Sequence, residues 1–294
     1  MPTADLSARP AAGPREAADW SRRQVLLTDL RAVRGRAYPR VIGLRRELSW
    51  IAFEILLPFL STSAFVFVYR ALGAPQEYIG FVVLGGALTA FWLNVVWMMA
   101  NQLYWEKSQG NLELYFAAPM HFMSILFGMA LGGMVMSSSR AVTVLVIASL
   151  LYGVVFSVDQ WALLVGVFLL TLAALYGLGM VLASLFLVWG REAAHMGQLL
   201  TEPVYFVSGL NFPVARLGFL GALSVALIPL ATGLDAMRQL VFAGAAFPVG
   251  TPPPDVEVAI LAVMAVVSIV AARWMLVAME RRARRDGRLS IRWQ

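Results

Sequence analysis

The sequence predicts an all-α integral membrane protein with six transmembrane helices. Of its 294 residues, 60% are hydrophobic and 14% are charged, whereas soluble domains average about 45–50% apolar and about 25% charged residues. Six stretches are long and apolar enough to cross a bilayer, which takes roughly 20 residues in one helix. Most basic residues lie outside these stretches. This composition argues against a water-soluble enzyme and against a disordered or fibrous chain.

The predicted transmembrane domain covers residues 48–279. Its third span is too long for one perpendicular crossing and contains Arg140, so we expect a tilted helix whose first turns lie at the inner surface. Between spans 5 and 6, residues 214–242 predict two short re-entrant helices in the outer leaflet, because Pro229 and Gly233 interrupt this apolar region. The six spans are 48–69, 78–103, 124–156, 160–188, 196–213 and 257–279.

The distribution of basic residues predicts the orientation. Eighteen of the 23 lysines and arginines would lie on one side of the membrane, mainly in residues 1–47 and 280–294. The opposite side would carry only Arg70, Arg216 and Arg238. Excess positive charge marks the cytoplasmic side, so we expect a multi-pass protein of the cytoplasmic membrane with both termini in the cytoplasm. Because the basic residues lie at membrane boundaries, no nucleic-acid partner is expected despite the net charge of +6.

Two basic terminal segments flank the spans. Residues 1–19 predict a disordered cytoplasmic tail. In residues 20–47, leucines such as Leu26 and Leu30 alternate with arginines, which is typical of an amphipathic helix on anionic lipid. A solvated, partly helical tail is the alternative. The arginine-rich segment 280–294 predicts a basic cytoplasmic tail that contacts lipid headgroups.

Catalytic and metal-binding patterns are missing. There is no cysteine, and neither His121 nor His195 has partners at metal-ligand spacing beyond Glu192, one turn before His195. A P-loop needs glycine before its lysine, whereas the single lysine, Lys107, follows Glu106. We therefore expect no catalytic residue, no metal and no bound cofactor in this chain. If ATP drives its work, another polypeptide must hydrolyse it.

The segment 104–120, between spans 2 and 3, predicts a short cytoplasmic helix bracketed by Gly110 and Pro119. Leu112, Tyr115 and Phe116 have i, i+3, i+4 spacing and so share one side of that helix. We expect them to form an apolar ridge that a partner's groove could accept. The alternative is an interfacial helix attached to lipid.

Two motifs follow one another along the chain. The first consists of Glu106, Gly110, Leu112, Glu113, Leu114 and Pro119. The second consists of Ser208, Gly209, Phe212, Pro213, Pro229, Leu230, Thr232 and Arg238. In this order they resemble the motifs of the membrane subunits of type-2 ABC exporters, the ABC-2 permease family, over roughly residues 36–280. Asn111 replaces the threonine usual in the first motif, and Leu217 lies where the second usually has another proline.

The resemblance implies a permease that forms a pore with a second permease subunit and docks separate ATPase subunits, which would hold ATP and magnesium. Segment 104–120 would be the coupling helix, including Tyr115 and Phe116, with Arg45, Arg46 and Glu47 in an elbow that also touches the ATPase. Segment 214–242 would close the exit. The outer gate would include Gly209, Phe212, Pro213, Pro229, Asp235 and Arg238.

Spans 1, 2 and 5 would line the substrate path. Glu54 lies about two turns into span 1, where an ionisable group is costly and is a functional candidate. A structural ion pair with Arg140 or Arg273 is the alternative. For Asp235 and Arg238, one turn apart, we expect pairing rather than substrate contact. Aromatic residues could line the path or simply pack and face lipid; the candidates are Phe53, Phe59, Phe65, Trp92, Tyr205 and Phe206.

The function that these features favour is ATP-driven export of an amphiphilic substrate such as a drug, lipid or glycolipid. Three alternatives stay open at this point. One is export of a polysaccharide or lipid-linked glycan by a member of the same family. Another is a secondary transporter driven by protons through Glu54, and the third is a scaffold or insertion factor without transport.

Overall fold

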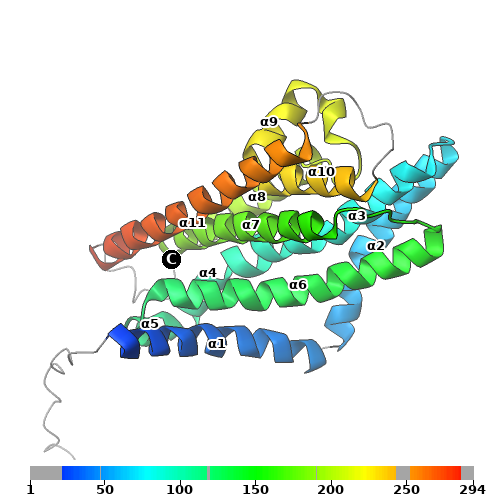
Figure 1. Cartoon of the computed structure of the whole chain (residues 1–294). Coiled ribbons are helices and arrows are strands. Elements are labelled where there is room, and N and C mark those ends of the chain that lie inside the picture. Colours follow the sequence, from blue (N-terminus) through cyan, green and yellow to red (C-terminus); the bar gives the residue numbers. More distant parts are fainter. Residues whose placement is uncertain (1–21, 47, 118–119, 190, 243–251, 286–294) are drawn as a thin grey trace, which may run out of the picture.

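The computed structural model describes residues 22–46, 48–117, 120–189, 191–242 and 252–285. These residues fold into a bundle of helices, and no β-strand is formed among them apart from one isolated bridge between Ser157 and Phe242 (Figure 1). The α-helices are α1 (Arg22–Arg46), α2 (Leu48–Ala71), α3 (Gln76–Leu93), α4 (Gln102–Ser108), α5 (Asn111–Ala117), α6 (Phe122–Tyr152), α7 (Trp161–Trp189), α8 (Arg191–Val207), α9 (Phe219–Leu227), α10 (Pro229–Val241) and α11 (Pro254–Arg285). A π-helix, η2 (Asn94–Ala100), and a 3₁₀-helix, η3 (Val214–Leu217), complete them.

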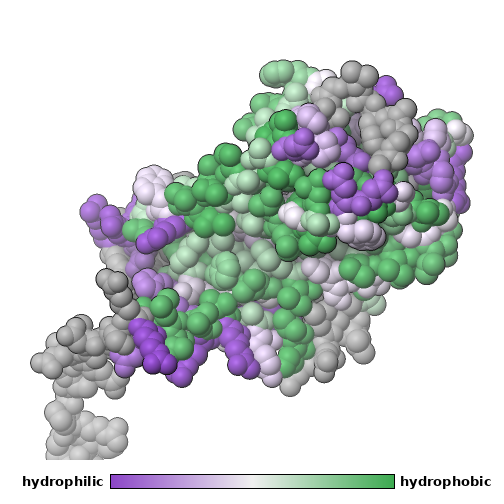
Figure 2. Space-filling view, viewed as in Figure 1, coloured by the Kyte–Doolittle hydropathy of each residue, from purple (hydrophilic) through white to green (hydrophobic). Residues whose placement is uncertain are grey.

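The all-helical, multi-pass membrane class is confirmed. Among the described residues, 5 helices are long and apolar enough to cross a membrane, or 6 if the bent pair α9–α10 counts as one broken span. Figure 2 shows an apolar band on one face, with hydrophilic residues gathered toward the ends of the bundle. The five spans are Ala52–Ala71, Gln76–Ser108, Phe122–Tyr152, Trp161–Leu185 and Pro254–Arg282.

The second span is the central element of the bundle. It runs through α3, η2 and α4 as one helix from Gln76 to Ser108, longer than the predicted 78–103, and it is the most deeply buried of the candidate spans. At the end of η2, the Asn101 side-chain amide donates to the carbonyls of Val96 and Trp97, each at 3.2 Å. These side-chain bonds lie where the helix passes from its π-helical turns into α4.

Two predicted span boundaries were wrong. The third span ends at Tyr152 rather than 156, because Gly153 has φ +68° and terminates α6 in the left-handed conformation. The predicted fifth span, 196–213, corresponds to α8, which ends at Val207 before a turn at Gly209. α8 has 17 residues, fewer than any of the five candidate spans, and it carries charged residues at its start. It is therefore not among these five.

The broken segment after α8 has the expected form of two short helices. α9 and α10 meet at Ile228 with a bend of 102°. Pro229 occupies the first turn of α10, where a missing N–H costs nothing. The backbone N–H of Ser157, between α6 and α7, donates to the Val241 carbonyl at 3.1 Å and holds the end of α10 in place.

Helix α1 runs alongside the first part of α6 (Figure 1). Two glycines of α6 permit this approach: a Cβ on Gly128 would lie 2.6 Å from the Val33 carbonyl oxygen, and one on Gly132 would lie 3.1 Å from that of Ala37. Arg40 points inward and donates to the Met129 carbonyl at 3.0 Å, while the leucines of α1, such as Leu30, stay exposed. The small-residue spacing of α6 therefore serves helix packing.

Replacing Gly128 by alanine should loosen α1 from α6, because the new methyl group has no room beside the Val33 carbonyl. Overpacking of this kind costs about 1–3 kcal/mol, so we expect a lower thermal unfolding midpoint in detergent. Gly166→Ala in α7 is the matched control, since a Cβ there meets nothing within 4 Å. An unchanged midpoint for Gly128→Ala would contradict this packing.

Candidate coupling and transport sites

A buried carboxylate, Glu106, organises the end of the bundle where α4 meets α5. Its Oε1 accepts from the Gln102 amide at 2.8 Å and forms an ion pair with Arg36 of α1. Its Oε2 accepts from the Asn111 amide at 2.9 Å and from the Tyr115 hydroxyl at 2.7 Å. One carboxylate thus joins α1, α4 and α5. Such charge-assisted hydrogen bonds are about twice as strong as neutral ones.

The Tyr115 hydroxyl is a permanent donor in this network, because burial and its hydrogen bond to Glu106 raise the pKa of Tyr115 to about 12. The Arg36 guanidinium also lies over the Tyr115 ring, 5.3 Å from its centroid. Tyr115 is therefore held from two sides, and α5 is fixed against α1 and α4 rather than loosely attached to the bundle.

The predicted apolar ridge of α5 needs correction. Leu112 is only 1% exposed and packs in the hydrophobic core, whereas Leu114 is 68% exposed. Helical spacing correctly grouped residues on one side but did not show that this side faces inward. Gly110, with φ +77°, makes the corner between α4 and α5. The side chains of Glu113 and Phe116 and the whole of Pro119 lie outside the described residues.

Helix α1 continues through the predicted elbow. Arg45 and Arg46 belong to its last turn, while their side chains and Glu47 lie outside the described residues. At the start of α6, the His121 backbone N–H donates to Asp29 of α1 at 2.9 Å, and the His121 ring nitrogen lies 2.8 Å from the other Asp29 oxygen. Burial raises the pKa of Asp29, but these contacts with His121 outweigh it and hold that pKa below its usual value.

A cavity of about 590 Å³ lies beside the first two spans. Glu54 of α2 and Arg140 of α6 form an ion pair at its wall. Of the two partners that the sequence allowed for Glu54, Arg140 and Arg273, the structure therefore favours Arg140. The remaining walls are largely apolar and aromatic. They include Phe53, Leu57, Pro58, Leu93, Asn94, Trp97 and Trp105.

A second cavity, of about 320 Å³, adjoins the first and shares Leu57, Pro58 and Leu93 with it. Tyr205 of α8 lines this cavity and accepts a hydrogen bond from the Asn211 amide at 3.2 Å. The ring of the neighbouring Phe206 packs edge-on against Phe212, with centroids 5.6 Å apart. Together the two cavities follow a surface formed mainly by α2, the second span and α8.

The other aromatic candidates have different surroundings. Trp92 is buried in the hydrophobic core and lines neither of the two adjoining cavities. Phe59 stacks on Tyr152 with centroids 6.5 Å apart, which is a packing role. Phe65 lies at the exposed surface of α2.

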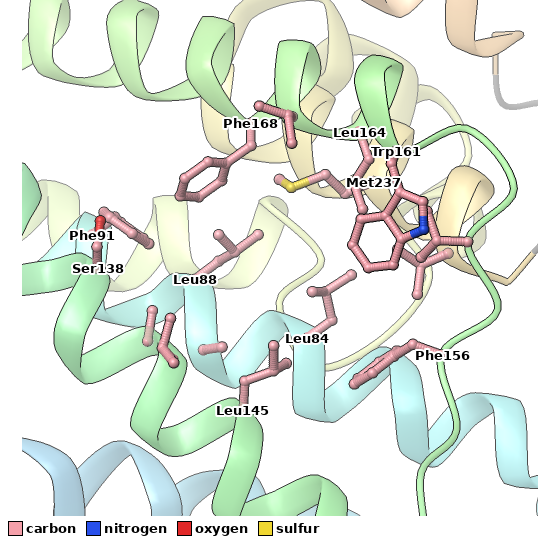
Figure 3. A pocket seen from close by; sticks show the side chains of 16 residues that line it. Leu84, Leu88, Phe91, Ser138, Leu145, Phe156, Trp161, Leu164, Phe168 and Met237 are labelled. Carbon is pink, nitrogen blue, oxygen red and sulfur yellow. The ribbon is translucent and has the colours of Figure 1, made fainter.

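A third cavity, of about 340 Å³, lies between α3, α6, α7 and α10. Figure 3 shows Leu84, Leu88 and Phe168 pointing into it, with Trp161 at one end. Ser138 provides its only side-chain hydroxyl, and the Trp161 indole its only side-chain N–H. This cavity suits hydrocarbon alone, in contrast to the cavity beside Glu54 and Arg140.

The predicted gate segment is anchored by a fully buried arginine. The two terminal nitrogens of Arg238 donate to the carbonyls of Gly209 at 2.7 Å, and of Leu210 and Phe81 at 2.9 Å each. The guanidinium also lies 4.7 Å from the Phe81 ring centroid. The expected Asp235–Arg238 pair is not formed: Arg238 binds backbone carbonyls, and Asp235 points toward Glu257 of α11.

Sequence reasoning missed several of these partners. Arg36 and Glu106 are 70 residues apart, and Arg238 and Phe81 are 157 apart, so no local spacing could pair them. The available signal was an ionisable residue next to an apolar run, which marks a buried charge but not its partner. Among the described residues, no group of three His, Asp or Glu side chains could hold a metal ion.

The spans, the bent helix pair and the two adjoining cavities define a polytopic membrane protein with polar sites inside its helix bundle. The chain belongs to the ABC-2 type transporter family, whose model matches residues 41–242. This family consists of permeases whose ATPase is a separate subunit, which implies partnership with an ABC ATPase that hydrolyses ATP. No curated protein matches the chain at a significant level.

Removing one member of the Glu54–Arg140 pair should destabilise the bundle. Arg140→Met takes away the guanidinium beside a carboxylate that lipid cannot solvate, a change that costs about 3–5 kcal/mol. We expect a marked fall in the thermal unfolding midpoint in detergent. The double variant Glu54→Leu/Arg140→Met should recover most of that loss. Equal destabilisation in the single and double variants would contradict an ion pair.

Proposed function

We propose that this chain is the permease subunit of an ATP-driven exporter, and that a separate ATPase subunit docks on α5. The observation that carries this proposal is the Glu106 network, because two side chains of α5, Asn111 and Tyr115, donate to this carboxylate of the central helix. Gln102 of the same helix and Arg36 of α1 hold the carboxylate in place. A helix held in this way can transmit a push. A loosely attached interfacial helix would absorb it.

The route of that push follows the second span. α5 is attached through Glu106 to α4, which continues as one helix to Gln76. Along its length this helix contributes walls to both adjoining cavities. Near its far end, the Phe81 carbonyl accepts a hydrogen bond from Arg238 of α10. A displacement of α5 would thus reach the cavities and the bent pair through a single element.

We place the α5 end of the bundle in the cytoplasm, with both termini, which requires α8 (Arg191–Val207) to cross the membrane as the sixth span. The support is charge: eighteen of the 23 basic residues would then be cytoplasmic, in accordance with the positive-inside rule. The bent pair α9–α10 would lie at the outer side and act as the exit gate, with Arg238 as its anchor.

The cargo that fits the cavities is amphiphilic, such as a drug, lipid or glycolipid. Phe53, Trp97 and Trp105 offer apolar and aromatic surface, while Glu54 and Arg140 supply a polar wall. A lipid-linked glycan has the same mixed chemistry and is the alternative cargo. The ion pair of Glu54 gives it a structural partner, so a proton-driven transporter that works through Glu54 is the weaker proposal.

The transport unit would contain a second permease subunit. α2 presents large apolar side chains at its surface, including Phe53, Leu57 and Phe67, and the adjoining cavities open beside this helix. A second copy, or a related permease, packed against α2 would enclose them and form a path between subunits. ATP and magnesium would be bound by the ATPase partner and not by this chain.

Substituting Leu114 tests the docking of the ATPase. Leu114→Glu places a charge on the exposed apolar side chain of α5, so we expect loss of co-purification with the ATPase while the spans keep their thermal stability. Leu114→Met should retain binding, and Gln109→Glu adds the same charge at the neighbouring corner as a control. Co-purification that survives Leu114→Glu would argue against docking at α5.

Trp97 and Trp161 provide a matched test of the cargo site, since both are exposed tryptophans that line different cavities. In vesicles with the partner ATPase, a panel of lipids, drugs and glycans would identify a stimulating cargo. Trp97→Ala should reduce that stimulation several-fold, and Trp161→Ala should leave it unchanged. The reverse pattern would move the cargo site to the apolar cavity.

A further inference from the structure

Two buried carboxyl groups from different helices meet where α10 packs against α11. Asp235 of α10 is 5% exposed, and Glu257, in the first turn of α11, is 0% exposed. The two carboxyl groups lie within hydrogen-bonding reach of each other. Figure 1 shows the start of α11 next to α10. The contact therefore joins one arm of the bent pair to a membrane span.

The hydrogen bonds around this pair leave it short of donors. The Gln239 amide donates to Glu257 Oε2 at 3.2 Å. Within the described part of the chain, Asp235 Oδ2 and Glu257 Oε1 are buried and receive no donor. An ionised carboxylate only accepts hydrogen bonds, whereas a protonated one also donates. A single proton would turn one carboxyl group into the donor that the other lacks.

One cation, Arg238, lies one turn after Asp235 and attracts its negative charge. Both terminal nitrogens of Arg238 donate to backbone carbonyls, and within the described residues it forms no ion pair with Asp235 or Glu257, so it offsets only part of the charge of an ionised pair. Of the other helices packed on α10, α9 carries no titratable residue, α7 carries Tyr176 alone, and α3 carries Glu77 and Tyr78. On α11 itself, the titratable residue close to Glu257 in the sequence is Asp255, which is exposed. The first arginine of α11, Arg273, lies sixteen residues beyond Glu257, roughly 24 Å along a helix. Residues 243–251 contain no charged residue.

We infer that Asp235 and Glu257 together bind one proton and form a carboxyl–carboxylate clamp between α10 and α11. Two carboxylates in contact cannot both be ionised in a poorly solvated site, so they share a proton. Loss of that proton places two negative charges side by side, with Arg238 one turn away but in ion-pair contact with neither of them. Their repulsion would separate α10 from α11, so the clamp closes at low pH and opens as the pH rises. This inference holds whether or not α5 docks an ATPase.

Infrared spectroscopy of the purified full-length chain tests the proton directly. A protonated carboxyl group has a C=O stretching band that is distinct from carboxylate bands, and we expect one such buried group at neutral pH that disappears on titration to alkaline pH. Glu257→Gln should abolish the band, because the amide supplies the missing donor and Asp235 can ionise. Glu77→Gln, at an exposed carboxyl group of α3, should leave it unchanged. A neutral-pH spectrum without the band, or a band that persists in Glu257→Gln, would overturn the inference.

Thermal unfolding tests the clamp. A group whose ionisation is opposed in the folded state stabilises the protein less as the pH rises, so the midpoint of the native chain should fall toward alkaline pH. In the double variant Asp235→Asn/Glu257→Gln, the two amides can bond to each other without a titratable proton, and we expect that fall to be lost or greatly reduced. The same pH dependence in both proteins would overturn the clamp, and the titration of the native chain requires no variant to fold.

Discussion

Lipid offers no hydrogen-bond partner, so each charged group inside this bundle must find its partner on another segment of the protein. The described residues meet that requirement in three ways. Arg238 is surrounded by backbone carbonyls, Glu54 and Arg140 neutralise each other, and Glu106 collects donors from three helices. Each solution fixes the relative positions of segments that are far apart in the sequence. The buried charges therefore determine which helices move together, while apolar packing determines that they are helices in a bundle at all.

The central helix from Gln76 to Ser108 unites these constraints. Glu106 lies in its last turns, Asn94 lines the cavity wall midway, and the Phe81 carbonyl binds Arg238 near its start. A helix of this length changes shape mainly where its hydrogen-bond pattern is already irregular, and the π-helical segment η2 is such a place. Because η2 also borders the cavity beside Glu54, an adjustment of its turns would change the cavity without separating the two anchored ends.

Composition and charge were enough to predict an all-helical membrane protein, most of its spans and a broken pair near Pro229, because the bilayer imposes length and hydrophobicity directly on the sequence. Finer features depend on the folded partner. The spacing of Leu112 and Tyr115 showed that they share a side of α5, but only the neighbouring helices make it the buried side. Likewise, the spacing of Asp235 and Arg238 permitted a local ion pair. In the folded protein, Arg238 instead binds backbone carbonyls from two distant segments. Asp235 lies against Glu257.

This division of partners gives the side chains of α10 two unlike attachments, besides the backbone hydrogen bond from Ser157 to Val241 at its end. On the side of α3, Arg238 binds carbonyl oxygens that cannot titrate, so that attachment holds at every physiological pH. On the side of α11, the attachment through Glu257 requires a proton on the carboxyl pair and is conditional. When the conditional attachment is lost, α10 remains fixed at Arg238 and can swing only away from α11. The bend at Ile228 is the nearest break in the helix, and it would accommodate this motion. A gate built in this way would open along one direction, because only the attachment to α11 depends on a proton that can be released.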